Sequence, residues 1–310
     1  MNPHRSARLA NGPTAVTIGN FDGVHRGHQA LIARTLEAAV AEQLGMVVVT
    51  FDPHPALILR GSIDRFLITP DPLKQRYLTE AGAQDIVTLP FTPAFRDMEP
   101  EVFLDHVLRE ELQARYVVVG DNFTFGRGGR GRVDFLRDWG LRQHIRVEVL
   151  PPERPAASDR PISSSWIRQL IQAGNLAEAI DLLGHPFTVA AVVSPGEQRG
   201  RALTVPTLNF EPPSTQVMPP FGVYAGFLTI QEQTYPAVAN WGVRPTFGGG
   251  RPRWEVHALE PVSWDLYGRT VEFDVIAWVR DEQQFESPEA LRRQIGRDVE
   301  QARALLEGRR

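Results

Sequence analysis

The chain has 310 residues, which exceeds the usual size of a single domain and predicts two. Its formal net charge of −4 argues against a protein that mainly binds nucleic acid, and the absence of cysteine excludes disulfides, thiolate chemistry and metal ligation through sulfur. No stretch reaches the about 18 apolar residues of a membrane span, and the first residues lack the apolar core of a secretory signal. We therefore expect a cytoplasmic protein that does not enter membranes.

Strand-like and helix-like segments alternate in the first half of the chain. A run at helical spacing over 28–45, ending on Gly45, and a second over 99–112, opened by Pro100, predict helices between short β-branched runs. Repeated βα units predict an α/β fold with a doubly wound parallel, Rossmann-like sheet, whose ligands lie beyond the carboxyl ends of the strands. The predicted strands cover 15–21, 46–51, 85–91, 115–123 and 145–152.

The pattern changes after a loop rich in proline and two short predicted helices within 162–184, which break near Gly174 and close at Gly184. We place the domain boundary there, giving domains of 1–184 and 185–310. Strand-like segments then follow one another without helices, which predicts an antiparallel β-barrel with a three-residue hairpin connection at 231–233. A terminal helix begins after its expected N-cap, Ser287. The predicted strands of this half cover 187–193, 222–230, 234–242, 253–260 and 270–279.

The stretch "GNFDGVHRGH" (19–28) places His25, Gly27 and His28 at a predicted strand-to-helix turn. Free N–H groups and the helix dipole attract anions there, Gly27 lets a ligand approach the backbone, and two imidazoles add donors for phosphate oxygens. On these residues alone, a polar surface turn remains an alternative. Metal binding is disfavoured because no third ligand has a recognisable spacing. Asp22 is expected to shape the turn.

A second candidate for phosphate binding is the start of the helix at 162–168. Ser163, Ser164 and Ser165 open this helix as N-caps or as phosphate ligands. Arg168, one turn later, could fork onto a phosphate or face solvent. Together with the two histidines, these residues outline a nucleotide site.

The segment "GDNFTFGRGGRGR" (120–132) contains Asn122 followed by glycines and arginines. It predicts a mobile glycine-rich loop near the ligand. An RGG-like nucleic-acid patch is the competing interpretation, which a single such run in an acidic chain does not favour. Phe123 and Phe125 are equally candidates for packing.

The second half carries its own candidate site. Gly196 and Gly200 lie in a basic loop that leads to Pro206, and the Thr207 hydroxyl and the Asn209 amide then share one side of an extended segment. Hard oxygen ligands of this kind suit a Mg²⁺ ion that also takes phosphate oxygens, and a turn with a side-chain hydrogen bond is the alternative.

A carboxylate on a predicted strand of the second half is a further candidate. Glu255 is either a general base that faces a pocket or a solvated residue on the strand surface.

These stretches, in this order, resemble the prokaryotic bifunctional riboflavin kinase/FMN adenylyltransferase family, also called FAD synthetase. "GNFDGVHRGH", "TFDPHP", "GDNFTFG" and "ISSSWIR" resemble the adenylyltransferase half, and "GRALTVPTLN", "FGVYAG", "NWGVRPTFGG", "WEVHALE" and "DLYGR" the kinase half. The resemblance implies that riboflavin and ATP give FMN, and that FMN and ATP give FAD and pyrophosphate. It implies Mg²⁺ as the metal, flavins as substrates and products, and no nucleic-acid partner. We expect a monomer or a weak oligomer.

The resemblance also assigns roles in adenylyl transfer. His25 and His28 would contact the ATP phosphates, with Ser164 and Arg168 closing the site from the other side. The FMN phosphate is already an anionic nucleophile, so this step needs no base and depends on orientation and charge stabilisation. Further ligand contacts in this half are implied for Gly19, Phe21, Asp22, Gly27, Asn122 and Ser163.

In the kinase step the nucleophile is a neutral ribityl hydroxyl, and the resemblance assigns the base to Glu255. Thr207 and Asn209 would hold Mg²⁺ with ATP, giving a phosphoryl transfer that rests on positioning and a metal ion. Further ligand contacts in this half are implied for Gly196, Gly200, Pro206 and Arg244.

Five positions depart from the family pattern. Ala191 and Thr204 stand where glycines are usual in the ATP-binding segment, and a Cβ there can block close phosphate approach. Leu208 replaces a small residue, Glu260 an aspartate and Ser165 a threonine. An FMN adenylyltransferase with a weak or inactive kinase domain is therefore the alternative function.

Overall fold

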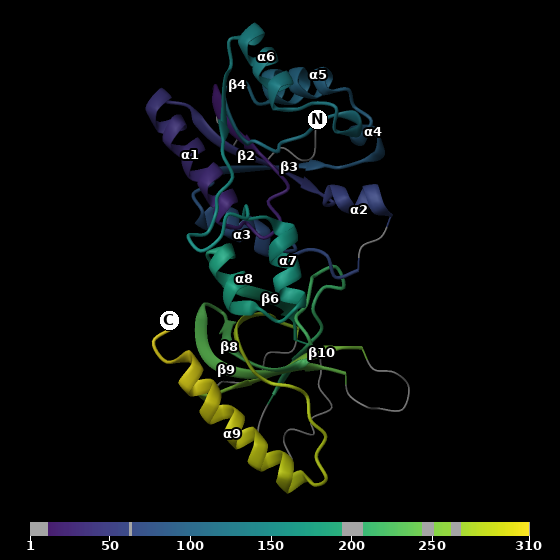
Figure 1. The fold of residues 1–310 in the computed structure, drawn as a ribbon, viewed down its shortest axis with the longest axis vertical. Coiled ribbons are helices and arrows are strands. Elements are labelled where there is room, and N and C mark those ends of the chain that lie inside the picture. Colours follow the sequence, from purple (N-terminus) through teal and green to yellow (C-terminus); the bar gives the residue numbers. More distant parts are fainter. Residues whose placement is uncertain (1–11, 62–63, 194–206, 244–250, 262–267, 310) are drawn as a thin grey trace. The chain divides into compact units, whose positions relative to one another are not determined.

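A computed structural model describes residues 12–61, 64–193, 207–243, 251–261 and 268–309 of the chain. The chain divides into two compact units, which we call the N-terminal unit and the C-terminal unit (Figure 1). The N-terminal unit consists of Met1–Ile63 and Asp71–Ser164, and the C-terminal unit consists of Asp64–Pro70 and Ser165–Arg310. The short segment Asp64–Pro70 therefore belongs to the C-terminal unit although its neighbours in sequence on both sides belong to the other.

The N-terminal unit is built on a five-stranded parallel sheet with the order β3-β2-β1-β4-β5. The β-branched runs form strands because their side chains are buried by helices on both faces, α1 on one and η1 with α6 on the other (Figure 1). This confirms the predicted doubly wound fold. The elements are β1 (Thr14–Ile18), α1 (Arg26–Glu42), β2 (Gly45–Asp52), α2 (Pro55–Arg60), α3 (Leu73–Glu80), β3 (Asp85–Pro90), α4 (Pro93–Arg96), α5 (Pro100–Phe103), η1 (Leu104–Glu111), β4 (Ala114–Gly120), η2 (Arg127–Gly129), α6 (Val133–Gln143) and β5 (Arg146–Leu150).

Two helices of this unit differ from their prediction. Helix α1 ends at Glu42, because Gln43 takes the left-handed cap conformation (φ 56°) and leaves Gly45 as the first residue of β2. The helix predicted over 99–112 is present, but its second part, η1, is π-helical.

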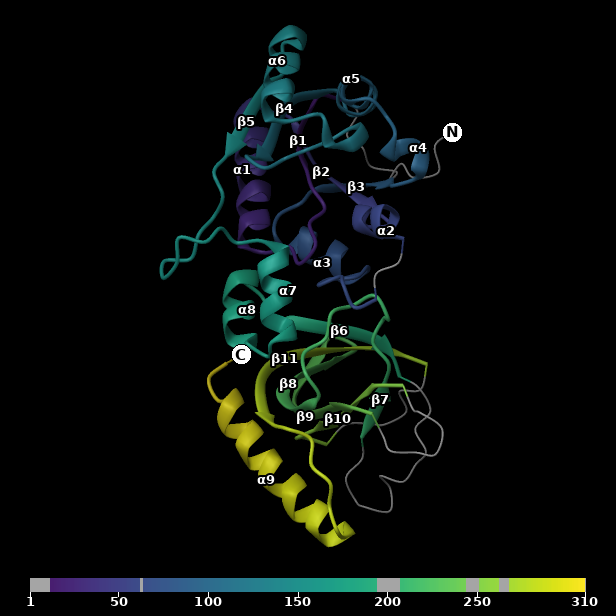
Figure 2. The ribbon, with the colours of Figure 1, turned by 45° about the vertical axis from the view of Figure 1, so that its right-hand side comes forward.

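The C-terminal unit contains a six-stranded antiparallel sheet with the order β6-β11-β8-β9-β10-β7, which curls into a half-barrel (Figure 2). This confirms the predicted antiparallel fold of the second half, and the terminal helix α9 packs against β8, β9 and β11. Helices α7 and α8 break at Gly174 and close at Gly184, as predicted, because both glycines have positive φ (81° and 76°). The elements are α7 (Ser164–Gln172), α8 (Leu176–Leu183), β6 (Phe187–Val192), β7 (Leu208–Phe210), β8 (Gly222–Ile230), β9 (Gln233–Gly242), β10 (Arg253–Ala258), β11 (Thr270–Arg280) and α9 (Pro288–Leu306).

The connection between β8 and β9 is shorter than predicted. Ile230 pairs with Gln233, so only Gln231 and Glu232 form the loop. Both have positive φ (47° and 71°), as two-residue hairpin turns that match the strand twist require. The prediction of a three-residue connection was wrong because neither residue is the glycine or asparagine that signals such a turn.

The segment Asp64–Pro70 is fixed to the C-terminal unit by hydrogen bonds. Backbone bonds of 2.7 to 2.9 Å join it to residues 214–217. The buried amide of Gln216 donates to the carbonyl of Ile68 at 3.1 Å and to that of Thr188 at 2.8 Å. These bonds explain why the segment groups with the sheet of this unit.

Helix α9 is docked through a buried ion pair. Ser287 caps the helix as predicted, accepting a hydrogen bond from the backbone N–H of Ala290 at 3.1 Å. Further along, Asp298 accepts from Nε and Nη2 of Arg280, the last residue of β11, at 2.9 and 2.8 Å. Both side chains are largely buried, so the charges are poorly screened.

Replacing Asp298 with alanine is expected to destabilise the C-terminal unit, because it leaves the Arg280 guanidinium buried without its counter-charge. The cost of about 3 kcal/mol corresponds to a fall of about 5–10 °C in the calorimetric midpoint. Glu300→Gln, an exposed change on the same helix, should leave the midpoint in place. Equal midpoints for the two variants would contradict the assigned role of the pair.

Candidate functional site

The loop between β1 and α1 is tightly folded at the carboxyl end of β1. Its start is held by a 3.1 Å hydrogen bond from the Gly19 N–H to the Val49 carbonyl. Phe21 and Val24 are fully buried and have positive φ (50° and 38°), which strains the backbone of residues with a Cβ. The side chain of Ser164, the first residue of α7, donates to the Asp22 carbonyl at 2.8 Å. The loop is therefore a fixed structure and not an open surface turn.

The two histidines lie together at the amino end of α1. His25 is the N-cap residue in an extended conformation, and its carbonyl accepts hydrogen bonds from the N–H groups of His28 at 2.7 Å and Gln29 at 3.0 Å. The imidazoles stack, with ring centroids 3.7 Å apart and planes at 15°. Burial, and to a lesser degree the neighbouring His25, lowers the pKa of His28 well below its usual range. The lowered pKa favours a neutral His28 imidazole, which lies beside the positive end of the helix dipole.

Two glycines of this motif are explained by packing. A Cβ on Gly27 would lie 3.3 Å from the His25 ring, and a Cβ on Gly19 would lie 3.2 Å from the ring of Phe21. Both contacts are tighter than normal carbon–carbon distances. The glycines let the aromatic rings close over the backbone.

The predicted contact residue after β4 lies in a turn. Asn122 is exposed, and the N–H of Phe123 donates to the Gly120 carbonyl at 3.1 Å. Phe123 packs against the hydrophobic core of the unit and Phe125 is part of it, as one of the two interpretations held. Asn122 thus stands at the carboxyl end of β4, the strand that neighbours β1 in the sheet.

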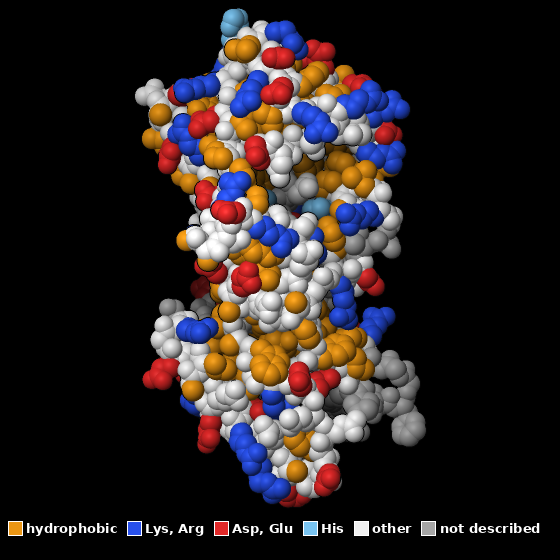
Figure 3. All heavy atoms as spheres, in the orientation of Figure 1, with side chains coloured by type: hydrophobic (Ala, Val, Ile, Leu, Met, Phe, Trp, Pro, Cys, Tyr) orange, Lys and Arg blue, Asp and Glu red, His pale blue; other side chains and the backbone are white. Residues whose placement is uncertain are grey.

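The glycine-rich loop is closed by backbone hydrogen bonds, and its predicted mobility stays a prediction. Phe125 and Gly131 exchange backbone hydrogen bonds of 3.0 and 2.9 Å, which close the loop. Arg127 and Arg130 reach the carboxylate of Glu99 at 3.6 and 3.5 Å. On the face of this unit shown in Figure 3, basic and acidic side chains are interspersed. These ion pairs and mixed charges do not favour an RGG-like nucleic-acid patch.

Arg168 makes its described contacts within the C-terminal unit. Its Nε donates to the Phe66 carbonyl at 2.7 Å, and its guanidinium carbon lies 3.8 Å from the centroid of the Phe66 ring. The structure therefore brings Ser164 to the loop of the histidines and binds Arg168 to the segment Asp64–Pro70.

The residues predicted in the second half come together on β7 and β10. Asn209 lies directly opposite Glu255, and Glu255 lies directly opposite Asn240 of β9. Side chains at directly opposed positions share one face of a sheet, with Cβ atoms about 5 Å apart. Asn209 is buried and Glu255 is half-buried. Thr207 directly precedes β7, two residues before Asn209.

Asn240 was not predicted from the sequence. It lies on the same sheet face as Glu255, and its side-chain amide donates to Glu282 at 3.5 Å. Its position two residues before Gly242 gives no local signal, since only the strand register shows which residue it opposes.

Two of the departures from the family pattern lie within strands of the C-terminal unit. Leu208 is buried and pairs with Val256, on the sheet face opposite to Asn209, so it does not crowd Asn209. Ala191 pairs regularly with Val271 inside β6 and β11, where a Cβ is accommodated. The predicted contacts Gly196, Gly200, Pro206 and Arg244, and the departure Thr204, lie outside the described residues.

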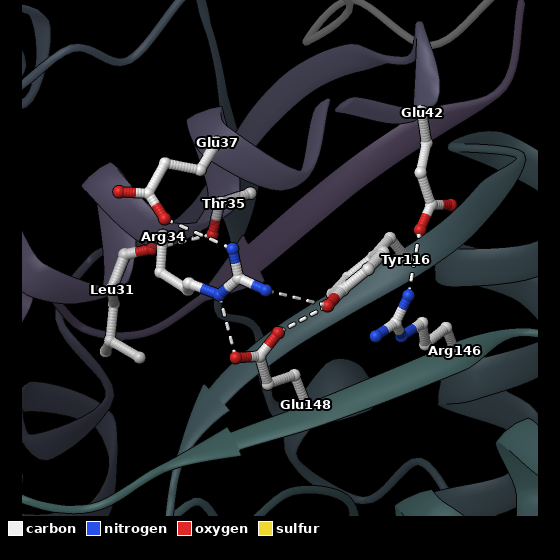
Figure 4. Close-up of polar contacts among 8 residues, drawn as sticks. All are labelled: Leu31, Arg34, Thr35, Glu37, Glu42, Tyr116, Arg146 and Glu148. Carbon is white, nitrogen blue, oxygen red and sulfur yellow. Dashed lines mark hydrogen bonds and ion pairs between the residues drawn. The ribbon is translucent and has the colours of Figure 1, made fainter. Parts of the chain in front are cut away.

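A polar cluster fixes α1 to the sheet beneath it (Figure 4). Nε of Arg34 donates to the carboxylate of Glu148 on β5 at 2.8 Å, and the buried hydroxyl of Tyr116 on β4 donates to the same carboxylate. The hydrogen bond from Arg34 lowers the pKa of Glu148, and burial raises the pKa of Tyr116. The cluster holds the helix that carries the histidines in register with two strands.

Glu148→Gln is expected to make the N-terminal unit less stable in a pH-dependent way. The lowered pKa of Glu148 contributes stability that is fully present above the pKa of the unfolded chain and is lost as the pH falls through the folded value. The free energy of unfolding of the wild type should therefore exceed that of the variant by about 1 kcal/mol at pH 7. This difference should shrink as the pH falls below about 4.3. Calorimetric midpoints over this range test the expectation.

Glu37→Gln is the matched control for this variant, because Glu37 also binds Arg34, at 3.1 Å, but is 69% exposed. It should change the midpoint little at any pH. A gap between Glu148→Gln and wild type that stays constant from pH 7 to pH 3 would refute the assignment.

The part of the chain that the structure describes contains no candidate membrane helix and no cluster of three or more metal-ligating side chains.

Comparison with known proteins identifies two families in the chain. The model of the FAD synthetase family matches residues 8–166, and that of the riboflavin kinase family matches residues 183–306. The bifunctional riboflavin kinase/FMN adenylyltransferase of Escherichia coli (strain K12) is 36% identical over 304 residues, covering 98% of this chain and 96% of its own. The protein of that name from Bacillus subtilis (strain 168) is 31% identical over 307 residues, covering 97% and 95%.

A solved structure shares the fold over nearly the whole length. It is a crystal structure described as a macrolide-efflux protein from Streptococcus pneumoniae, with a TM-score of 0.83 and 31% sequence identity, and the match covers 94% of this chain and 95% of that one. Both family matches and the full-length relatives agree on one assignment. The chain belongs to the bifunctional riboflavin kinase/FMN adenylyltransferase family.

Proposed function

We propose that this chain phosphorylates riboflavin with ATP to give FMN, and transfers AMP from a second ATP to FMN to give FAD and pyrophosphate. One observation carries the proposal. The same chain stacks two imidazoles at the amino end of α1 and sets a carboxylate opposite an amide on β10 and β7. The first arrangement suits the binding of a polyphosphate in a reaction step that needs no general base. The second suits the activation of an alcohol next to a metal-bound phosphate.

In adenylyl transfer, an oxygen of the FMN phosphate attacks the α-phosphorus of ATP, and the bond to the β-phosphate breaks to release pyrophosphate. His25, His28 and the amino end of α1 would bind the phosphates, where negative charge develops on the leaving group. The stacked rings and the fixed loop support this role because the donors are held before the ligand arrives. Ser164 lies at the same loop. Arg168 would bind a phosphate as well, since its contact with the Phe66 carbonyl uses only Nε of the guanidinium.

In the kinase step, the carboxylate of Glu255 would take the proton of the ribityl 5′-hydroxyl. The hydroxyl oxygen would attack the γ-phosphorus of ATP, and ADP would leave. Thr207 and Asn209 would hold Mg²⁺, and the fit is good because hydroxyl and amide oxygens are hard donors. The ion, when bound, would neutralise phosphate charge. The direct opposition of Asn209 and Glu255 supports the proposal, since it places the base beside a residue that would hold the Mg²⁺ bound to the ATP phosphates.

We further propose a functional boundary after Gly184. The match to the FAD synthetase family ends at residue 166, and the match to the riboflavin kinase family begins at residue 183. Helix α8 ends at Gly184, next to the start of the second match. The proposed partners are ATP, riboflavin, FMN and FAD, without nucleic acid or membrane. We propose a cytoplasmic monomer or weak oligomer.

Incubation of the purified chain with riboflavin, ATP and Mg²⁺, followed by separation of the flavins, tests the function. FAD formed from riboflavin supports both activities. FAD formed only from added FMN would favour an adenylyltransferase with an inactive kinase domain. The regular strand around Ala191 and the position of Leu208 favour the first result.

A further inference from the structure

Phe21 occupies an unusual place in the loop between β1 and α1. Its side chain is 0% exposed, although its φ of 50° is strained for a residue with a Cβ. Such a conformation persists only where the surrounding structure determines it. The ring lies against Gly19, where even a Cβ would approach it to 3.2 Å. A fully buried ring cannot serve a ligand by direct contact, so the reason for its position lies in its neighbours.

The neighbour that matters for the reaction is His28. The edge of one ring meets the face of the other, with centroids 5.0 Å apart and planes at 61°. A face of His28 is covered by the stacked ring of His25 at 3.7 Å. Nδ1 of His28 is buried and has no hydrogen-bond partner among the described residues. The orientation of the imidazole therefore depends on ring contacts and not on a hydrogen bond at that nitrogen.

We propose that Phe21 is a positioning residue for adenylyl transfer, which wedges the imidazole of His28 against that of His25 and shields it from water. This inference rests on the proposed role of His28 in binding the ATP phosphates. This role of the Phe21 ring requires no contact with substrate, in contrast to the ligand contact that the resemblance implies. Its ring sets the direction of the remaining nitrogen of His28, Nε2, and the low polarity around the ring.

The pKa of His28 depends on the groups that surround its ring, and it can therefore be used to test whether Phe21 shields the ring from water. From its own loop the titratable group in contact with His28 is His25, whose ring stacks on it. From the chain after β5, the Cβ of Glu153 lies 3.8 Å from the Cβ position of Gly27. The dominant influence on His28 is burial, followed by His25. Loss of the Phe21 ring would admit water and bring the pKa of His28 up toward its ordinary value of about 6.5.

The test compares Phe21→Leu with Phe103→Leu in the full-length chain. Leucine keeps an apolar side chain and carries the same backbone strain, but it lacks the aromatic edge. Phe103 is a buried residue of the same unit whose ring contacts Phe95 and Phe125, both at 5.8 Å. It controls for the loss of an aromatic ring from the core without contact with His28.

Three quantities are measured for each variant: FAD formation from FMN, FMN formation from riboflavin, and the NMR titration of the His28 ring. Phe21→Leu should lower kcat for FAD formation by about 10–100-fold, because a small misplacement of a binding group has effects of this size. It should move the His28 titration, and the pH profile of kcat/KM for ATP, to higher pH. FMN formation should stay at the wild-type level.

Phe103→Leu should leave the pH profile and the His28 titration where they are in wild type. The proposal fails if Phe21→Leu keeps the wild-type kcat and His28 titration, or if Phe103→Leu shifts both equally. If Phe21→Leu does not fold, Phe21→Met takes its place, because the unbranched methionine side chain adapts better to an irregular space. A wild-type chain that forms no FAD would refute the proposed function, while the titration would still decide whether Phe21 shields His28.

Discussion

Replacing His28 with alanine is expected to lower FAD formation from FMN by about 10²–10³-fold, the usual effect of removing one preorganised donor to developing charge. The stacked pair at the amino end of α1 would lose the imidazole that packs against both His25 and Phe21. FMN formation from riboflavin should remain at the wild-type rate, because Glu255 and Asn209 lie on a sheet of the other compact unit. Both rates are measured on the same purified chain by separating the flavins.

His106→Ala is the control for this variant. His106 lies on η1 in exposed contacts with Glu110 and Glu111, so its loss should affect neither activity. A His28→Ala protein that is folded and loses both activities would show that the two reactions share a site. A variant that retains FAD formation would remove His28 from the phosphate site.

Much of the fold follows from local patterns. The parallel strands are short runs of β-branched residues whose burial on both faces needs no knowledge of their partners, and α7, α8 and α9 are marked by Gly174, Gly184 and Ser287. Elements that depend on distant partners were not predicted. The turn at Gln231 and Glu232 takes positive φ values that the register of β8 and β9 imposes. The polar helix α3 owes its place to tertiary contacts, including a bond from its buried Lys74 to the Phe51 carbonyl.

The segment Asp64–Pro70 is the clearest case of a feature that sequence reasoning could not reach. It lies between α2 and α3 of the N-terminal unit, yet its hydrogen bonds lead to residues 214–217. No local pattern encodes a pairing across about 150 positions, because such pairings depend on tertiary context. The same segment supplies Phe66, which holds Arg168.

The residue types and their spacing predicted the candidate site residues. They did not predict the neighbouring residues that hold those side chains in place. The sequence suggests two imidazoles at a strand-to-helix turn because histidine beside glycine at such a place suits phosphates. It does not suggest that Phe21 has a left-handed backbone and packs on His28, because most residues with a Cβ avoid that conformation. Likewise, the opposition of Asn209, Glu255 and Asn240 depends on strand register.

The two sites are supported by different means, which bears on how variants should behave. The histidines rest on a loop and on a helix clamped by Arg34, Glu148 and Tyr116. Glu255 lies within a continuous hydrogen-bonded sheet, paired on both sides. Removing a side chain from a paired strand leaves its backbone bonds in place, so a substitution of Glu255 should change chemistry more than structure.

Glu255→Gln is expected to lower FMN formation from riboflavin by about 10²–10⁴-fold, the range that general base catalysis contributes. Glutamine keeps the size of the side chain and its place opposite Asn209, but it cannot accept the hydroxyl proton. FAD formation from added FMN should be unchanged, since that step needs no base. Glu211→Gln, an exposed change directly after β7, is the matched control and should retain both activities. Because Glu255→Gln leaves the backbone hydrogen bonds of β10 in place, KM for ATP should change little in this variant while kcat for FMN formation falls. An equal loss of ATP affinity would mean that Glu255 acts with Thr207 and Asn209 in holding the metal-bound nucleotide, and retention of kcat would mean that the proton leaves by another group.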